Sequence, residues 1–328
     1  MKPADYVLKA TPLIIFGIAA YFLYAYCFRF CWKHVGGGPG IVMISIFAVL
    51  LSLIYICWLE IIVLGPGYVP KRQSMELEQV PNEMPQIFMC DPEGFRQWCS
   101  HCKTVKIDRS HHATQLGRCV PRMDHYCGWL GMVIGEGNIK LFIQIVFYFW
   151  LIMIYTVITL LIFAHSGGIS ALFIVLYAIS GAWILLLTGF LGVHIRYVLI
   201  NITTIENMDL GRMNYPIYNF ECNGRRVVLR LQHEDFVPQG PYSQGYWNNW
   251  KMVMGSNALN WSMPIPLRSA VGNDAFNEKL LQVLRLRYLS GKEGYPAFLQ
   301  PGQNEGPKLA PAPGQGQLAA EGPGGVTD

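Results

Sequence analysis

The apolar residues of the chain are gathered in runs long enough to cross a lipid bilayer. The longest run, Leu141–Ile195, has 55 residues without a single Asp, Glu, Lys or Arg. A helix rises about 1.5 Å per residue, so this run is too long for one crossing of a hydrocarbon core about 30 Å thick. The sequence His-Ser-Gly-Gly at 165–168 is typical of a turn. The run therefore predicts two membrane-spanning helices.

Two further apolar stretches lie upstream. Pro12–Phe28 lies between Lys9 and Arg29. Ile41–Leu59 precedes Glu60. The first stretch could be a cleaved signal peptide, but its apolar core is long, and aromatic residues follow it instead of a small-residue cleavage site. We therefore predict a polytopic α-helical membrane protein with four transmembrane helices.

Basic residues predict how these helices are oriented. The loop between the second and third helices, Gly65–Lys140, carries 9 Lys and Arg, the segment from Arg196 onward carries 12, and the connection between the third and fourth helices carries none. Arg29 and Lys33, in the expected first loop, favour the opposite orientation. By the positive-inside rule, we expect both termini and the Gly65–Lys140 loop in the cytosol, at an endomembrane or the plasma membrane.

These patterns divide the chain into five parts. Residues 301–328 contain 12 Gly or Pro and no aromatic residue, which is typical of a disordered tail. The expected parts are 1–64 with the first two helices, 65–139 as a cytosolic cysteine-rich domain, 140–195 with the last two helices, 196–300 as a cytosolic region, and the 301–328 tail.

Composition agrees with a membrane protein and narrows the classes of function. The chain is 52% hydrophobic and 14% charged, which disfavours a fully soluble protein. No phosphate-binding glycine motif is present, and the basic residues are not interleaved with aromatic ones as they are in nucleic-acid-binding surfaces. We therefore expect the lipid bilayer, and no nucleic acid, among the partners.

Five of the nine cysteines lie in the loop expected in the cytosol. A reducing compartment favours metal ligands or reactive thiols over disulfides. Cys99 and Cys102 have the C-x2-C spacing of a zinc knuckle, which needs two more ligands. The residues alone leave open whether these ligands are His112 and Cys119 or an all-cysteine set that includes Cys127. Other nearby candidates are His111 and His125.

Asp124, His125 and Cys127 form a second group with possible chemistry. An imidazole can take the proton of a neighbouring thiol, and a carboxylate can fix the imidazole tautomer, so these three residues could make a nucleophilic site. Such a short string alone is more often structural. Its position between a zinc knuckle and a membrane helix that begins at about Ile139 favours the catalytic interpretation.

The loop from Trp98 to Phe142 resembles the cysteine-rich domain of the DHHC family of protein S-acyltransferases, in the DHYC variant of some fungal members. Three other segments resemble family motifs. Thr203–Glu206 is similar to the TTxE motif, and 245–250 (GYWNNW) is similar to the aromatic C-terminal motif. Gly65–Gly67 is similar to DPG but departs from it at the first residue.

The resemblance implies one structural zinc ion where the family binds two. The first family site falls on Cys99, Cys102, His112 and Cys119. The second falls on Ala113, Leu116, Tyr126 and Val133, which cannot form a zinc ligand set. The resemblance therefore also implies that Cys127 is not a ligand.

The activity that the resemblance implies is protein S-palmitoylation. Cys127 would take a long-chain acyl group from palmitoyl-CoA or another acyl-CoA and pass it to cysteines of cytosolic or membrane proteins. His125 would act as the base and Asp124 would orient it. Trp129 would line the mouth of the acyl cavity, and the TTxE and aromatic motifs, with Thr203, Thr204, Glu206 and Asn249, would position the loop. Candidates to hold the CoA phosphates are Arg109, Arg118, Arg122, Lys140 and Arg196.

Two other functions fit parts of the pattern. A catalytically silent membrane scaffold, whose zinc loop binds client proteins, would explain the loss of a zinc site, but it would not need Asp124, His125 and Cys127. A channel or transporter is disfavoured because the predicted helices hold almost no charge.

Overall fold

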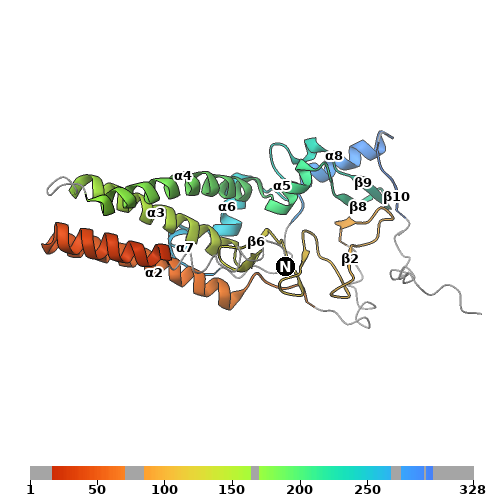
Figure 1. Cartoon of the computed structure of the whole chain (residues 1–328). Helices are drawn as coiled ribbons and strands as arrows, with labels where there is room; N and C mark the ends of the chain where they lie inside the picture. Colours follow the sequence, from red (N-terminus) through yellow and green to blue (C-terminus); the bar gives the residue numbers. More distant parts are fainter. Residues whose placement is uncertain (1–16, 71–84, 164–169, 267–274, 292, 298–328) are drawn as a thin grey trace, which may run out of the picture.

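A bundle of long helices carries at one end a head made of small hairpins and a sheet (Figure 1). The structure is a computed structural model, and it describes residues 17–70, 85–163, 170–266, 275–291 and 293–297. Among these residues, three helices are long and apolar enough to cross a membrane. They are α2 (Gly37–Leu64), α3 (Ile139–Phe163) and α4 (Ala171–Ile200), and α3 packs against both of the others.

The first predicted helix differs from expectation at its end. Residues from 17 onward are helical and continue as a wide π-helix, η1 (Leu23–Val35). Arg29 and Lys33 therefore lie in a helix, and their prediction as loop residues was wrong. Both side chains are exposed, so the charges stay at the surface and do not end the helix. Residues 12–16 of the predicted span lie outside the described residues.

Helices α2 and α4 also run past their predicted ends. Glu60 lies inside α2, and Arg196 lies inside α4. The helices end where the backbone takes a positive φ, at Gly65 (67°) and at Asn201 (52°), a conformation typical of helix C-termini. The turn predicted at 165–168 lies outside the described residues.

Aromatic residues join η1 to the other helices. Tyr26 is fully buried and shares a 2.8 Å hydrogen bond with Thr159 of α3. The ring of Phe30 packs edge-on against Phe173 of α4, with 5.2 Å between centroids. The first helix is therefore part of the bundle.

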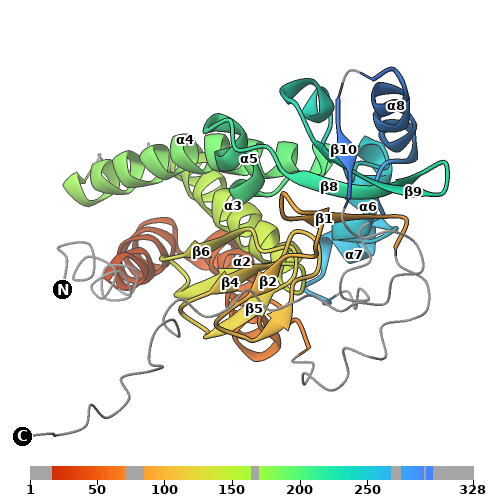
Figure 2. The same cartoon turned by 90° about the vertical axis from the view of Figure 1, so that its right-hand side faces the viewer.

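The loop between α2 and α3 folds into three two-stranded hairpins (Figure 2). Each hairpin is antiparallel, and together they lie at one end of the bundle. The strands are β2 (Trp98–Cys99) with β3 (Thr104–Val105), β4 (His111–Ala113) with β5 (Arg118–Val120), and β6 (His125–Cys127) with β7 (Met132–Ile134).

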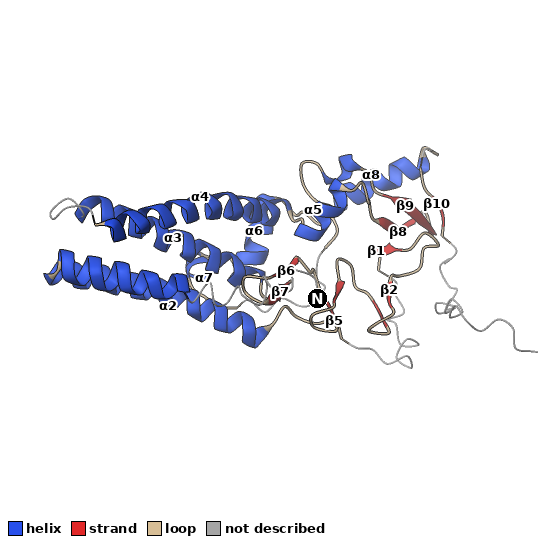
Figure 3. Cartoon of the chain, viewed as in Figure 1, coloured by secondary structure: helices blue, strands red, loops and turns tan. Residues whose placement is uncertain are grey.

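The region after α4 forms a four-stranded antiparallel sheet that includes a strand from the loop (Figure 3). Strand β1 (Ile87–Cys90) pairs with β8 (Ile217–Cys222), so the predicted boundary between 65–139 and 196–300 does not separate two independent units. The remaining elements are β9 (Arg225–Arg230), β10 (Tyr295–Pro296), α5 (Thr204–Gly211), the 3-10 helix η4 (His233–Phe236), α6 (Tyr246–Met254), α7 (Ala258–Ser262) and α8 (Glu278–Leu289).

Polar side chains of the bundle hold the segment after α4 in place. Gln144 of α3 donates to the carbonyl oxygens of Trp261 and Met263, at 2.9 and 2.8 Å. Lys140 donates to the carbonyl oxygen of Ile265 at 2.6 Å. Asn249 is buried and donates to the carbonyl oxygen of Leu199 at the end of α4. Asn249 therefore has the positioning contact expected of it.

Candidate active site and metal centre

Four ligand side chains meet between the first two hairpins of the loop. One ligand atom each of Cys99, Cys102, His112 and Cys119 lies within 4.8 Å of the other three. The His112 Nδ1 atom is 3.2 Å from the Cys102 Sγ and 3.6 Å from the Cys99 Sγ. The structure thus assembles a group that could hold a metal ion, and Cys127 is not part of it.

Backbone geometry explains how this group forms. Cys99 ends β2, and the Cys102 N–H approaches the Cys99 sulfur at 3.4 Å across the tight turn. His112 and Cys119 are direct partners in the β4–β5 hairpin, so their side chains leave the same face. Two short turns are enough to bring the four ligands together.

The positions of the family's second zinc site are packed with apolar residues. Ala113 and Val133 are both 1% exposed and share a cluster with Val120 and Met123. Leu116 packs against the same cluster. Tyr126 is 36% exposed and does not belong to it. Three of these four positions, Ala113, Leu116 and Val133, therefore share one apolar cluster.

Strand β6 presents the predicted catalytic residues. Side chains alternate along a strand, so His125 and Cys127 share one face and Tyr126 takes the other. The His125 Nδ1 atom lies 2.7 Å from the Asp124 Oδ2, and Cys127 follows on the same face of the strand. The structure therefore brings Cys127, His125 and Asp124 together in that order.

Thr204 holds Asp124 in place from the other side. Its backbone N–H donates to Oδ1 at 2.8 Å, and its hydroxyl donates to Oδ2 at 2.7 Å. Thr203 and Glu206 form a capping box that sets this end of α5. The TTxE-like segment is thus a helix N-terminus aimed at the carboxylate.

These contacts set the charges of the pair. Burial alone would raise the pKa of Asp124, but hydrogen bonds from His125 and Thr204 outweigh it and hold the pKa below its usual value. Burial also disfavours a charged His125, yet its hydrogen bonds to Asp124 and Cys127 raise its pKa to about 9. At neutral pH, His125 is therefore mainly imidazolium and Asp124 is carboxylate.

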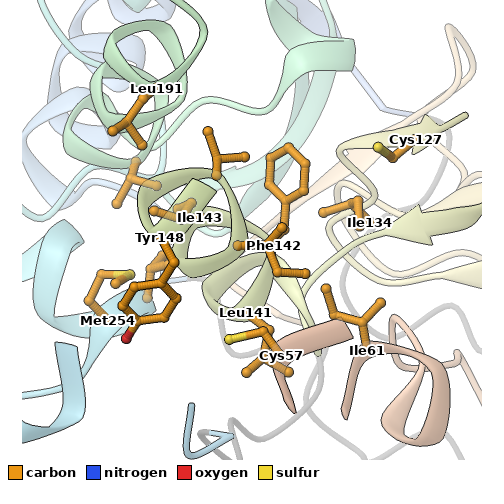
Figure 4. Close-up of a cluster of buried hydrophobic side chains, with 14 of the residues drawn as sticks. Cys57, Ile61, Cys127, Ile134, Leu141, Phe142, Ile143, Tyr148, Leu191 and Met254 are labelled. Carbon is orange, nitrogen blue, oxygen red and sulfur yellow. The ribbon is translucent and has the colours of Figure 1, made fainter. Parts of the chain in front are cut away.

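Cys127 lies at the end of the apolar core of the bundle. It is 7% exposed and belongs to a cluster with residues of α2, α3 and α4. Figure 4 shows it beside Ile134 and Phe142, with Cys57 and Ile61 of α2 further along the cluster. The thiol thus adjoins both a polar loop and a large apolar interior.

Arg109 does not have the exposure expected of a CoA ligand. Its side chain is fully buried and paired with Glu206 at 2.6 Å. It also donates to the Asn201 Oδ1 at 2.9 Å and lies over the Tyr242 ring. Because its charge is engaged inside the protein, Arg109 supports the end of α4 and the start of α5 instead of facing a ligand.

Among the other candidates for the CoA phosphates, Lys140 is 5% exposed and donates to Ile265, whereas Arg118 and Arg122 are half-buried. Arg118 lies over the Tyr68 ring at 4.3 Å, and Arg122 donates to the Asn201 Oδ1 at 2.8 Å. Trp129 is 56% exposed, and its ring is 6.1 Å from Trp183 of α4. Trp129 therefore stands next to α4.

Comparison with known proteins adds an independent observation. Residues 92–210 match the family model described as DHHC palmitoyltransferase. The chain is 34% identical to Palmitoyltransferase PFA5 of Candida glabrata over 283 residues, which cover 78% of this chain and 79% of that protein. The chain belongs to the DHHC palmitoyltransferase family. It is also 31% identical to Palmitoyltransferase PFA5 of Kluyveromyces lactis, over 77% of this chain and 80% of the relative.

More distant members of the DHHC palmitoyltransferase family also align over most of the chain. Probable protein S-acyltransferase 13 of Arabidopsis thaliana is 26% identical over 245 residues, which cover 69% of this chain and 72% of that protein. The family resemblance drawn from the loop motifs is confirmed.

Sequence reasoning missed one residue that reaches the DHYC site of this family member. His194 of α4 is buried, and its ring lies 5.7 Å from that of His125. It lies inside an apolar membrane helix, where a single histidine gives no local signal. The one available clue was distance along the chain. His194 precedes Thr203 by nine residues, which is about two and a half helical turns.

Removing the Thr204 hydroxyl tests how the family's TTxE-like segment acts. Thr204→Val keeps the backbone donor to Asp124 and removes the side-chain donor. A hydrogen bond to a charged group contributes about 1.5 kcal/mol or more, so we expect acyl-enzyme formation to slow about tenfold. Single-turnover acylation measures this, with Thr114→Val, at an exposed threonine between β4 and β5, as the control. Equal rates for both variants would contradict the positioning role.

Proposed function

We propose that the chain moves a long-chain acyl group from acyl-CoA to Cys127 and then to cysteine thiols of other proteins. In the first step, the Cys127 sulfur bonds to the acyl carbonyl carbon, the bond from that carbon to the CoA sulfur breaks, and CoA leaves. In the second step, the sulfur of a protein cysteine takes the acyl group and Cys127 is released. The observation that carries this proposal is the Asp124–His125–Cys127 arrangement at the end of the apolar bundle.

His125 carries out the proton transfers in this mechanism. Its raised pKa keeps His125 mainly as an imidazolium, and this positive charge would stabilise negative charge on the Cys127 sulfur as that sulfur attacks the acyl carbonyl carbon. It gives its proton to the departing CoA sulfur. In the second step it takes the proton of the incoming protein thiol and again stands as an imidazolium beside the released Cys127 sulfur. Asp124, ionised and held by Thr204, keeps the imidazole oriented.

The apolar interior next to Cys127 suits the acyl chain. A sixteen-carbon chain contributes on the order of 10 kcal/mol when buried, at about 0.8 kcal/mol per CH₂. Placing the thiol at the end of the bundle lets the chain enter between helices while CoA stays in water. Trp129 and Trp183 would flank this entrance, and Arg118 and Arg122 remain our candidates for the CoA phosphates.

The metal centre is proposed to hold one structural zinc ion. In a tetrahedral site with Zn–S of about 2.3 Å and Zn–N of about 2.0 Å, ligand atoms lie about 3.5 to 3.8 Å apart, which the four ligand atoms can satisfy. Three thiolates and one imidazole are a set that zinc favours. When bound, the ion would hold the first two hairpins together, and it takes no part in acyl transfer.

We expect elemental analysis to give one zinc ion per chain. Tyr126→His would restore the DHHC motif, but we expect it to leave the zinc content at one ion per chain and to lower activity modestly. Ala113 and Val133 offer no ligands, and the apolar cluster stays packed. The unaltered chain is the control, and two zinc ions in it would refute the proposed ligand set.

The chain is a membrane protein, and we propose that it spans the membrane four times, with the loop and both termini in the cytosol. The helix that ends at Val35 would be the first span, since it packs into the bundle through Tyr26 and Phe30. The substrates would then be proteins with cysteines at the cytosolic membrane face.

Protease protection on sealed vesicles tests this topology. We expect cytosolic protease to cut near Lys103 in the exposed turn after Cys102 and to leave the connection between α3 and α4 intact. After detergent dissolves the vesicles, the protease should also cut the connection between α3 and α4, which is the control for protease access. Cleavage between α3 and α4 with Lys103 protected would reverse the orientation.

Labelling with an alkyne fatty acid tests the proposed reaction. We expect a label on the chain that neutral hydroxylamine removes, because hydroxylamine cleaves thioesters, and a peptide map that places it on Cys127. Transfer of the label to a cysteine-bearing membrane protein should follow. A chain that carries no thioester would favour the scaffold function instead.

A further inference from the structure

A second histidine lies against the catalytic pair. His194 comes from α4, while His125 comes from β6, and 69 residues separate them in the chain. The ring of Phe142 packs edge-on against both, with centroids 5.1 Å from His125 and 5.0 Å from His194. Phe190 packs against His194 at 4.5 Å. The His194 ring is therefore held in one place beside His125.

His194 also shares a small cavity with Asp124. The cavity has a volume of about 20 Å³, and Thr203, Arg122 and Tyr197 line it as well. A space of this size can hold one water molecule when polar groups surround it. His194 and Asp124 can therefore interact through a single bridging water.

The hydrogen bonds of Asp124 leave room for one more donor. A carboxylate has about four acceptor positions. Oδ2 accepts from the Thr204 hydroxyl and from His125, and Oδ1 accepts from the Thr204 backbone N–H. One position on Oδ1 remains in this count, and Asp124 lines the cavity.

We propose that His194 is a positioning residue for acyl transfer, which donates a hydrogen bond to Asp124 through one water molecule and fixes the His125 ring by contact. This inference rests on the assignment of His125 and Asp124 to the proton steps. In this role His194 acts through Asp124 and His125, so it affects the rate of the chemical step and leaves the binding of acyl-CoA unchanged.

The choice of substitutions separates this role from simple packing. His194→Phe keeps an aromatic ring against Phe142 and Phe190 but has no N–H. His194→Asn and His194→Gln keep a polar N–H near the position of one or the other ring nitrogen but lose the ring. If His194 only packs, the Phe variant should acylate faster than both amide variants. If His194 has the proposed role, the better amide variant should acylate faster than the Phe variant.

We expect single-turnover acylation of the full-length chain with palmitoyl-CoA to slow about tenfold in His194→Phe, and by less in the better amide variant. The palmitoyl-CoA concentration at half-maximal rate should not change. His34→Gln is the matched control, because His34 is also packed among aromatic rings, near Phe163 at the other end of the bundle. It should keep the normal rate.

A His194→Phe variant as fast as the unaltered chain, or faster than both amide variants, would overturn the proposal. Cys127→Ser, measured in parallel, separates this failure from a failure of the proposed function. If Cys127→Ser still forms the acyl-enzyme, the catalytic assignment itself is wrong, and the role of His194 falls with it.

Discussion

Replacing Cys127 with serine is expected to abolish both acyl-enzyme formation and transfer to protein substrates. An alcohol is scarcely ionised beside a single histidine, so the serine oxygen would be a poor nucleophile towards the thioester. The substitution changes one atom, and Cys127 does not belong to the metal group. We therefore expect expression, zinc content and thermal stability to stay close to normal while the hydroxylamine-sensitive label disappears.

Cys222→Ser is the matched control for this experiment. Cys222 is also a buried free thiol, but it lies in β8 within a separate apolar cluster. Its substitution should leave labelling at the normal level. If Cys127→Ser kept the label and turnover, another residue would have to be the nucleophile.

Replacing Cys102 with serine is expected to remove the metal and unfold the first two hairpins. Binding of structural zinc contributes on the order of 10 kcal/mol to small modules of this kind, which is comparable to the whole stability of a domain. The strands β2 and β3 have two residues each and cannot hold their shape without cross-links. Activity should be lost as a consequence of lost structure.

Metal content and limited proteolysis of the loop check this result. Cys90→Ala is the control, because Cys90 lies in the same loop outside the metal group, and we expect it to keep the full zinc content. A Cys102→Ser variant with normal zinc and normal activity would contradict the assigned ligand set.

Local sequence patterns predicted the features that depend on near neighbours. Cys99 and Cys102 are three residues apart, and Asp124, His125 and Cys127 lie within four consecutive positions. Their contacts follow from one turn and one strand. Apolar run length likewise predicted α2, α3 and α4.

The features that the sequence did not predict depend on distant partners. Arg109 was predicted as a candidate to hold the CoA phosphates because its partner, Glu206, lies 97 residues away in the chain. The helix ends were misplaced because charged residues such as Glu60 and Arg196 were taken as boundaries, whereas the helices end at Gly65 and Asn201. His194 was missed because only the fold brings α4 to β6.

The pairing of β1 with β8 has a consequence for synthesis of the chain on the ribosome. The loop leaves the ribosome well before Thr204, which holds Asp124, and before Ile217, where β8 begins. Domains generally fold from the N-terminus as they are made, but here the proposed nucleophile Cys127 and its partner His125 emerge ahead of Thr204, which contacts Asp124. We therefore expect the nascent chain to gain activity only after α4 has been made and the segment behind it has folded back onto the loop.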